Sequence, residues 1–212
     1  MGLIDLRSTK KFSQGHVKGS CSIHVDRLAS SMFELPANHH PVALLGEAIE
    51  LEQGQQFLES KGYQIKECIL ANESLWQQVA EHNLLQEGYH SVQLWQANPL
   101  LSEVIAQVEQ SVAGRAAIDL ACGAGRDSVY LAGRGWDVTA IDNKQDTLER
   151  CQRLAKSSQV SLSTLLMDLE TKVNPLSDLS ADLVLIMRYL HRPLFPAIKD
   201  LIKPGGAIIY ST

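Results

Sequence analysis

The sequence predicts an α/β protein made of two domains, of which the larger, C-terminal one is built on a parallel β-sheet. Short apolar runs alternate with stretches of helical periodicity, and the alternation occurs twice along the chain. In the second pattern the runs are apolar on both sides, as expected of parallel strands that are covered by helices on both faces. A length of 212 residues is sufficient for two small domains.

The first α/β pattern extends over residues 1–71, which we assign to an N-terminal domain. Its apolar runs predict strands, and one segment of helical spacing, with Gly62 at its end, predicts a helix. The strands are expected at "GLIDLR" (2–7), "PVALLG" (41–46) and "IKECIL" (65–70), and the helix at 51–63.

A stretch without strand character separates the two patterns. Residues 73–86 have helical spacing and are followed by Gly88, so we expect a helix there within a linker at 72–90. A clearer amphipathic helix is predicted at 98–112, with Pro99 near its start, where the missing N–H costs little. This helix introduces a C-terminal domain at 91–212.

The C-terminal domain shows the more regular alternation. Strands are predicted at 116–121, 137–142, 162–168, 182–187 and 206–211, and helices at 126–134, 145–157 and 194–202.

Composition excludes several classes of function. The net charge is −5 and neither part of the chain is basic, which argues against nucleic acid as a partner. The apolar runs are too short to cross a bilayer, and no signal-peptide pattern is present. The four cysteines have no metal-binding spacing. We therefore expect a cytoplasmic protein with free thiols, no metal site and no membrane association.

The stretch "AIDLACGAGRDSVYLA" (117–132) carries the strongest functional signal. Gly123 and Gly125 lie between a strand and a helix, where glycine allows a close approach of the backbone to a ligand and the helix N-terminus offers free N–H groups. A plain tight turn would also use glycine. However, Asp142 ends the next predicted strand, where its carboxylate can accept both hydroxyls of a ribose.

The nicotinamide dinucleotide fingerprint is the obvious rival. Its third glycine is replaced here by Ser128. Asp119, at the end of the strand, would repel a pyrophosphate but suits an ammonium group. These two residues favour S-adenosylmethionine, which has a sulfonium and an amino acid tail.

"IDLACGAGRD" resembles the first motif of class I S-adenosylmethionine-dependent methyltransferases, with Ala121 in place of the first glycine. Later segments follow in the family's order over roughly 93–212: "AIDN", "MDLE", "ADLVLIMRYLH" and "LIKPGGAIIYST". "LWQANPLL" and "RYLHRPLF" are similar to the tellurite-resistance-type small-molecule branch. The resemblance implies a Rossmann-like domain that continues beyond a fifth strand, so we expect the chain to be C-terminally incomplete.

The resemblance also implies site residues. Asp119 would receive the methionine amino group, Gly123 and Gly125 would pass beside the cofactor, and Ala121 would have to fit its methyl there. The remaining cofactor contacts would be Asp142 on the ribose, Asn143, Asp168 and Leu169 on the adenine, and Met187 near the reactive methyl. Tyr189 and His191 are candidate catalytic residues, although packing of "YLHRPLF" is an alternative.

Residues 5–23, "DLRSTKKFSQGHVKGSCSI", resemble the rhodanese signature, and the similarity covers about 2–71. Active rhodaneses carry a cysteine after the next core strand, whereas "GEAIELEQG" follows it here. Cys21 and Cys68 lie elsewhere and are expected to be buried. The resemblance implies a degenerate, N-terminally incomplete module that packs or contacts a protein partner.

Together these observations favour an S-adenosylmethionine-dependent methyltransferase of a small-molecule acceptor. The alternative is a non-catalytic S-adenosylmethionine-binding or interaction protein. Sulfurtransfer and nicotinamide-dependent chemistry rank below both.

Overall fold

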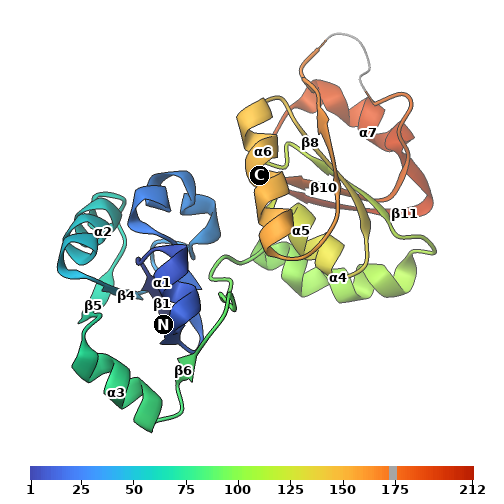
Figure 1. Cartoon of the computed structure of the whole chain (residues 1–212). Coiled ribbons are helices and arrows are strands. Elements are labelled where there is room, and N and C mark those ends of the chain that lie inside the picture. Colours follow the sequence, from blue (N-terminus) through green and yellow to red (C-terminus); the bar gives the residue numbers. More distant parts are fainter. Residues whose placement is uncertain (172–175) are drawn as a thin grey trace. The chain divides into compact units, whose positions relative to one another are not determined.

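The computed structural model describes residues 1–171 and 176–212, and the chain forms two compact units, Met1–Trp95 and Gln96–Thr212 (Figure 1). No helix in the described ranges is long and apolar enough to cross a membrane.

The N-terminal unit is built on a four-stranded parallel sheet in the order β3-β1-β4-β5. The strands are β1 (Gly2–Asp5), β3 (Ser20–Ser22), β4 (Val42–Gly46) and β5 (Ile65–Leu70). The helical segments are α1 (Thr9–Gln14), η1 (Val25–Ser30), η2 (Met32–Glu34), α2 (Ala48–Ser60) and α3 (Glu73–Glu81). A short antiparallel ribbon joins β2 (His16–Val17) to β6 (Leu85–Gln86).

Three strands and one helix predicted for this unit are confirmed, although the first strand ends at Asp5 and the helix is shifted at both ends. Helix α2 begins at Ala48, earlier than predicted, because the side chain of Glu50 accepts the Glu47 backbone N–H at 2.8 Å and caps the first turn. The prediction that Cys68 is buried is wrong. It lies on the edge strand β5 and is exposed, whereas Cys21 is buried as expected.

The segment predicted as a linker, 72–90, is instead part of the N-terminal unit. The helix predicted at 73–86 ends at Glu81, since Asn83 takes a left-handed φ of 55° and turns the chain into β6. The boundary between the two units falls between Trp95 and Gln96.

The C-terminal unit has a five-stranded parallel sheet in the order β11-β10-β7-β8-β9. The strands are β7 (Ala116–Leu120), β8 (Asp137–Asp142), β9 (Ser163–Leu166), β10 (Ala181–Met187) and β11 (Ile202–Ser211). The helices are α4 (Pro99–Ser111), α5 (Arg126–Gly133), α6 (Gln145–Ser157), η3 (Arg192–Leu194) and α7 (Phe195–Leu201).

Alternate residues of β10 enter two different cores, which explains its uninterrupted apolar sequence. Leu183 and Leu185 pack in a cluster with α4, while Val184 and Ile186 pack in another with α7. The predicted two-sided parallel sheet is therefore confirmed. Strand β11 differs most from its predicted range of 206–211. It already pairs with β10 at Ile202, and the register between the two strands then shifts.

Candidate functional site

The candidate site lies beyond the carboxyl ends of β7 and β8. From β7 the chain adds β8 and β9 on one side of the sheet and then crosses to β10 on the other. Ligands of open parallel sheets bind at such a reversal of strand order. The loop 121–125 that follows β7 occupies this position.

Ala121, Gly123 and Gly125 all have left-handed backbone conformations, with φ values of 58°, 57° and 78°. The two glycines differ in their surroundings. A Cβ added at Gly125 would overlap the Sγ of Cys151 on α6, and the Cβ of Cys151 would lie only 2.8 Å away. A Cβ added at Gly123 would meet nothing within 4 Å. Gly125 is therefore required for packing against α6, whereas open space faces Gly123.

The side chain of Asp142 connects the loops after β7 and β8. One carboxylate oxygen accepts the backbone N–H of Gly123 at 3.0 Å. The other accepts the backbone N–H of Lys144 at 3.1 Å. Each oxygen keeps a further lone pair for a ligand hydroxyl.

A pocket of about 130 Å³ opens beside Asp142. Five of the residues predicted to bind a cofactor line it: Ala121, Asp142, Asn143, Asp168 and Leu169. They come from the ends of three neighbouring strands, β7, β8 and β9, so the sheet topology brings them together. Met167, Glu170 and Tyr189 complete the lining.

Glu170 is a pocket residue that the sequence reasoning missed. Its backbone N–H donates to the Asp168 carboxylate at 3.0 Å, and this turn presents both acids at the pocket. Leu169 between them is buried in the core, with 5% of its surface exposed. The sequence signal that could have identified Glu170 is its position as a second acid two residues after Asp168.

Asp119 lies outside this pocket lining and is buried at the end of β7. The Ser128 hydroxyl donates to its carboxylate at 2.5 Å. Burial raises the pKa of Asp119 to about 8, with smaller contributions from the negative charges of Asp127 and Asp142. A buried carboxyl of this kind gains from any cation that reaches it.

Tyr189 and His191, the candidate catalytic residues, follow β10, with ring centroids 6.5 Å apart. Tyr189 lines the pocket, and its hydroxyl donates to Glu170 at 3.4 Å. Burial and the negative charge of Glu170 raise the pKa of Tyr189 to about 12. A phenol with this pKa is a poor base near neutral pH, so Tyr189 is better suited to cover a ligand. Met187 packs against the core on the α4 side and does not line the pocket.

Cys122 also lies in the loop. Its hydrogen bond with Cys151 and its burial raise the pKa of the Cys122 thiol well above its usual range. The protonated thiol is a poor nucleophile. In the described part of the chain, no group of three or more His, Cys, Asp or Glu residues is arranged to hold a metal ion.

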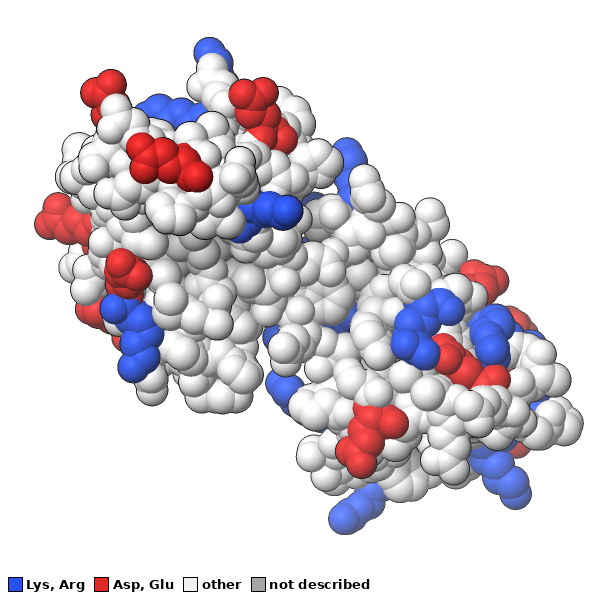
Figure 2. Space-filling model, turned by 90° about the horizontal axis from the view of Figure 1, so that it is seen from below, with Lys and Arg blue, Asp and Glu red and all other residues white. Residues whose placement is uncertain are grey.

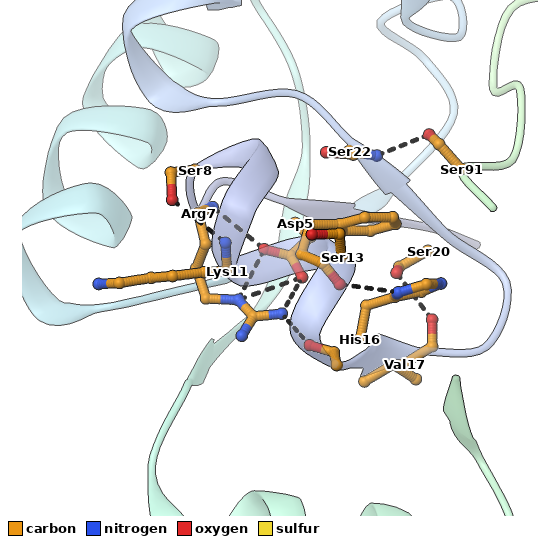
Figure 3. Close-up of polar contacts among 12 residues, drawn as sticks. Asp5, Arg7, Ser8, Lys11, Ser13, His16, Val17, Ser20, Ser22 and Ser91 are labelled. Atoms are coloured by element: carbon orange, nitrogen blue, oxygen red, sulfur yellow. Dashed lines mark hydrogen bonds and ion pairs between the residues drawn. The ribbon is translucent and has the colours of Figure 1, made fainter. Parts of the chain in front are cut away.

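In the N-terminal unit, residues of the segment 5–23 form a cluster of polar contacts (Figure 3). Arg7 donates to Asp5 from Nε at 2.9 Å and from Nη2 at 2.6 Å, and Nη2 also donates to the Gly15 carbonyl oxygen at 2.8 Å. His16 is fully buried, and its Nδ1 lies 3.0 Å from the carbonyl oxygen of Phe12. These contacts connect β1 to the α1 segment and give Asp5, Arg7 and His16 a structural role.

The loop after β4 contains Glu47. Its carboxylate forms an ion pair with Lys11.

The face of the molecule in Figure 2 shows acidic and basic side chains interspersed rather than one basic patch.

The comparison with protein families finds a similarity in the C-terminal unit. Residues 117–206 match a family described as a methyltransferase domain. This range includes the glycine loop, Asp142 and the pocket. Over this range the C-terminal unit is similar to methyltransferase domains.

Particular relatives are ubiquinone biosynthesis O-methyltransferases. That of Acinetobacter baylyi is 30% identical over 130 residues, covering 56% of this chain and 52% of that protein. That of Bordetella avium is 31% identical over 126 residues, covering 54% and 49%. The chain spans about half the length of the curated relatives it matches.

Among solved structures, a methyltransferase of Thiobacillus denitrificans in complex with S-adenosylhomocysteine is similar. The identity is 21% and the TM-score 0.45, with coverage of 53% of this chain and 47% of that one.

Proposed function

We propose that this protein binds S-adenosylmethionine in its C-terminal unit and transfers the methyl group to a small-molecule acceptor. The observation that carries the proposal is the pocket in which Asp142, Asn143 and Asp168 meet beside the glycine loop. Their oxygens match the hydrogen-bonding groups of an adenosine, with Asp142 toward the ribose hydroxyls and Asp168 toward the adenine amino group.

The loop supports the same proposal. The open space in front of Gly123 leaves room for a ligand against the backbone. Asp119 is a buried carboxyl next to this loop, and an ammonium group would offset the cost of its ionisation. A pyrophosphate would add negative charge near Asp119 and Asp142, which argues against a dinucleotide.

When bound, S-adenosylmethionine supplies a methyl group on a cationic sulfur, ready for displacement by a nucleophile. The residues of this chain would fix the adenosine, align the amino acid tail and exclude water. His191 is the candidate for accepting a proton from the acceptor, because the raised pKa of Tyr189 disfavours that role.

The acceptor is proposed to be a small molecule, in line with the relatives whose names describe O-methyl transfer in ubiquinone biosynthesis. Assignment to the tellurite-resistance-type branch rests on the segments "LWQANPLL" and "RYLHRPLF" alone.

Calorimetric titration of the chain with S-adenosylmethionine, S-adenosylhomocysteine and NAD tests the proposal. Asp142→Ala should abolish binding of both adenosyl ligands. Asp146→Ala, which removes an exposed carboxylate on α6, is the matched control and should bind normally. Unchanged affinity in the Asp142 variant, or preference for NAD, would contradict the assignment. Binding without methyl transfer to any acceptor in a phenol and carboxylic acid panel would favour the non-catalytic alternative.

We further propose that the N-terminal unit is a rhodanese-like module without sulfurtransferase activity that packs or contacts a protein partner. The buried Asp5–Arg7 pair and the ion-paired Glu47 at the position of the active loop support this reading. The four free cysteines fit a reducing compartment, and we propose the cytoplasm.

A further inference from the structure

Two of the four cysteines meet at the glycine loop. Cys122 lies within the loop 121–125, and Cys151 lies on α6, the helix that follows the turn after Asp142. Both thiols are free, and Cys151 is buried whereas Cys122 is partly exposed. The proposed methyl transfer uses neither of these thiols.

The fold brings the two sulfur atoms to the same turn of the backbone. The N–H of Gly125 donates to the carbonyl oxygen of Cys122 at 3.0 Å and closes this turn. The Sγ of Cys151 packs against its far end, where it would overlap a Cβ added at Gly125, and the Cα of Cys151 would lie 3.2 Å from that Cβ. The Cys122 thiol donates to the Gly123 carbonyl oxygen at 3.4 Å and also forms a hydrogen bond with the Cys151 thiol. The two thiols are therefore in contact.

We propose that Cys122 and Cys151 form a redox-sensitive pair, which hydrogen peroxide closes into a disulfide that weakens ligand binding at the glycine loop. The Cys122 thiolate attacks one peroxide oxygen and breaks the O–O bond, which gives a sulfenic acid and a first molecule of water. The Cys151 thiolate then attacks the Cys122 sulfur and displaces hydroxide, which takes up a proton and leaves as the second water. The two sulfur atoms lose two electrons, and these reduce the peroxide.

The surroundings of the thiols decide which one reacts first and how readily. Cys122 is the first to react because its side chain is partly exposed, whereas the buried Cys151 acts second. The hydrogen bond with Cys151 and burial raise the pKa of the Cys122 thiol well above its usual range, so little reactive thiolate exists at neutral pH. The pair should therefore stay reduced under mild conditions and respond to sustained oxidation, faster as the pH rises.

A disulfide would change the loop where it faces the ligand space. The bonded sulfur atoms of a disulfide are about 2.0 Å apart, closer than those of two hydrogen-bonded thiols, so Cys122 and α6 must approach each other. The next residue, Gly123, donates its N–H to Asp142 at 3.0 Å and faces open space. Oxidation should therefore disturb the backbone at Gly123 and its hydrogen bond to Asp142. This part of the inference rests on the proposed function.

The test follows disulfide formation and ligand binding in the same protein. Wild type is treated with hydrogen peroxide at pH 7 and at pH 9, digested, and searched by mass spectrometry for a peptide pair that joins Cys122 to Cys151. The cross-link should form faster at pH 9. Calorimetric titration with S-adenosylhomocysteine before and after treatment should show a loss of about 10-fold in affinity, which dithiothreitol reverses.

Two variants separate this pair from the other thiols. Cys151→Ala removes one partner, and its own affinity should not respond to peroxide. Cys68→Ser removes an exposed thiol of the N-terminal unit and is the matched control, which should respond as wild type does.

A treated wild type without the cross-link between Cys122 and Cys151 overturns the redox pair. A cross-linked protein with unchanged affinity overturns its effect on binding. A reduced wild type that does not bind S-adenosylhomocysteine overturns the proposed function, and the presence or absence of the cross-link still decides whether the pair forms.

Discussion

The hydroxyl of Ser128 donates a hydrogen bond of 2.5 Å to the carboxylate of Asp119, joining the first turn of α5 to the end of β7. Ser128 replaces the third glycine of the dinucleotide fingerprint. A glycine there would keep the backbone hydrogen bond from residue 128 but would remove the hydroxyl donor from the buried Asp119, where losing a hydrogen-bond donor is costly. The hydroxyl of Ser128 and the buried carboxyl of Asp119 therefore depend on each other structurally.

Asp119 predicts a pH-dependent stability. Its pKa is raised to about 8 in the folded chain, against about 3.9 when unfolded. Between these values the folded chain keeps a proton that the unfolded chain has lost, so the free energy of unfolding should fall as pH rises from about 4 to 8. The loss is at most about 1.4 kcal/mol per pH unit.

Asp119→Asn removes this titration while keeping an acceptor for Ser128. Urea unfolding at pH 6 and pH 8 should show the variant gaining stability relative to wild type at the higher pH. Parallel pH profiles for the two proteins would show that Asp119 is ionised throughout.

The two glycines of the loop should respond differently to alanine. Gly125→Ala places a methyl group against Cys151 at a φ of 78°, and overpacking with backbone strain should cost about 3 kcal/mol of stability. Gly123→Ala meets no protein atom and should cost about 1 kcal/mol, but its methyl points into the ligand space and should weaken S-adenosylhomocysteine binding. Denaturant unfolding and calorimetry measure both effects. Adding Cys151→Ala to Gly125→Ala should recover part of the stability, and no recovery would place the strain elsewhere.

Ala121→Gly should stabilise the protein by about 0.5–1 kcal/mol, because Ala121 has a φ of 58° that glycine adopts freely. The neighbouring Ala124→Gly is the control. The φ of Ala124 is not positive, so glycine relieves no strain there. The added freedom of the unfolded chain should therefore lower the stability of the Ala124→Gly variant. Equal destabilisation by both changes would rule out strain at Ala121.

Tyr189 is expected to pack against the ligand rather than to carry protons. Tyr189→Phe should bind S-adenosylhomocysteine as wild type does, whereas Tyr189→Ala should lose about 10-fold in affinity with the aromatic surface. Calorimetric titration of both variants separates the two roles. A large loss in the phenylalanine variant would mean that the hydroxyl contacts the ligand.

The buried Asp5–Arg7 pair should be a main support of the N-terminal unit. Asp5→Ala leaves the Arg7 guanidinium, 7% exposed, without its partner, which should cost about 3–5 kcal/mol. Lys11→Met breaks the exposed pair with Glu47 and should cost about 1 kcal/mol at most. Thermal unfolding of the whole chain distinguishes them, and similar small losses would show that solvent reaches Arg7.

The sheet of the C-terminal unit could be predicted from sequence because burial on both faces leaves uninterrupted apolar runs such as 182–187. The end of α3 could not, since Glu81 to Gln86 keeps helical spacing while a single left-handed Asn83 stops the helix. The spacing of apolar residues does not reveal that one residue adopts a left-handed φ and ends a helix.

The candidate site also has features that could be predicted from sequence and features that could not. Asp142 was predictable because strand ends in a parallel sheet share one edge, whereas Asp168 was implied by the family resemblance of "MDLE". The packing role of Gly125 was not, because it depends on Cys151, which is distant in sequence and adjacent only in the fold. The hydrogen bond between Ser128 and Asp119 is also invisible until β7 and α5 pack together.

The two backbone hydrogen bonds to Asp142 have a consequence for how a ligand is recognised. Because Gly123 and Lys144 hold the carboxylate from both sides, its rotamer is set before any ligand arrives. A ribose would meet acceptors already in place, and little conformational entropy would remain to be lost on association. Recognition of a ribose at this end of the pocket would therefore be rigid, and selectivity should depend on ligand shape more than on loop closure.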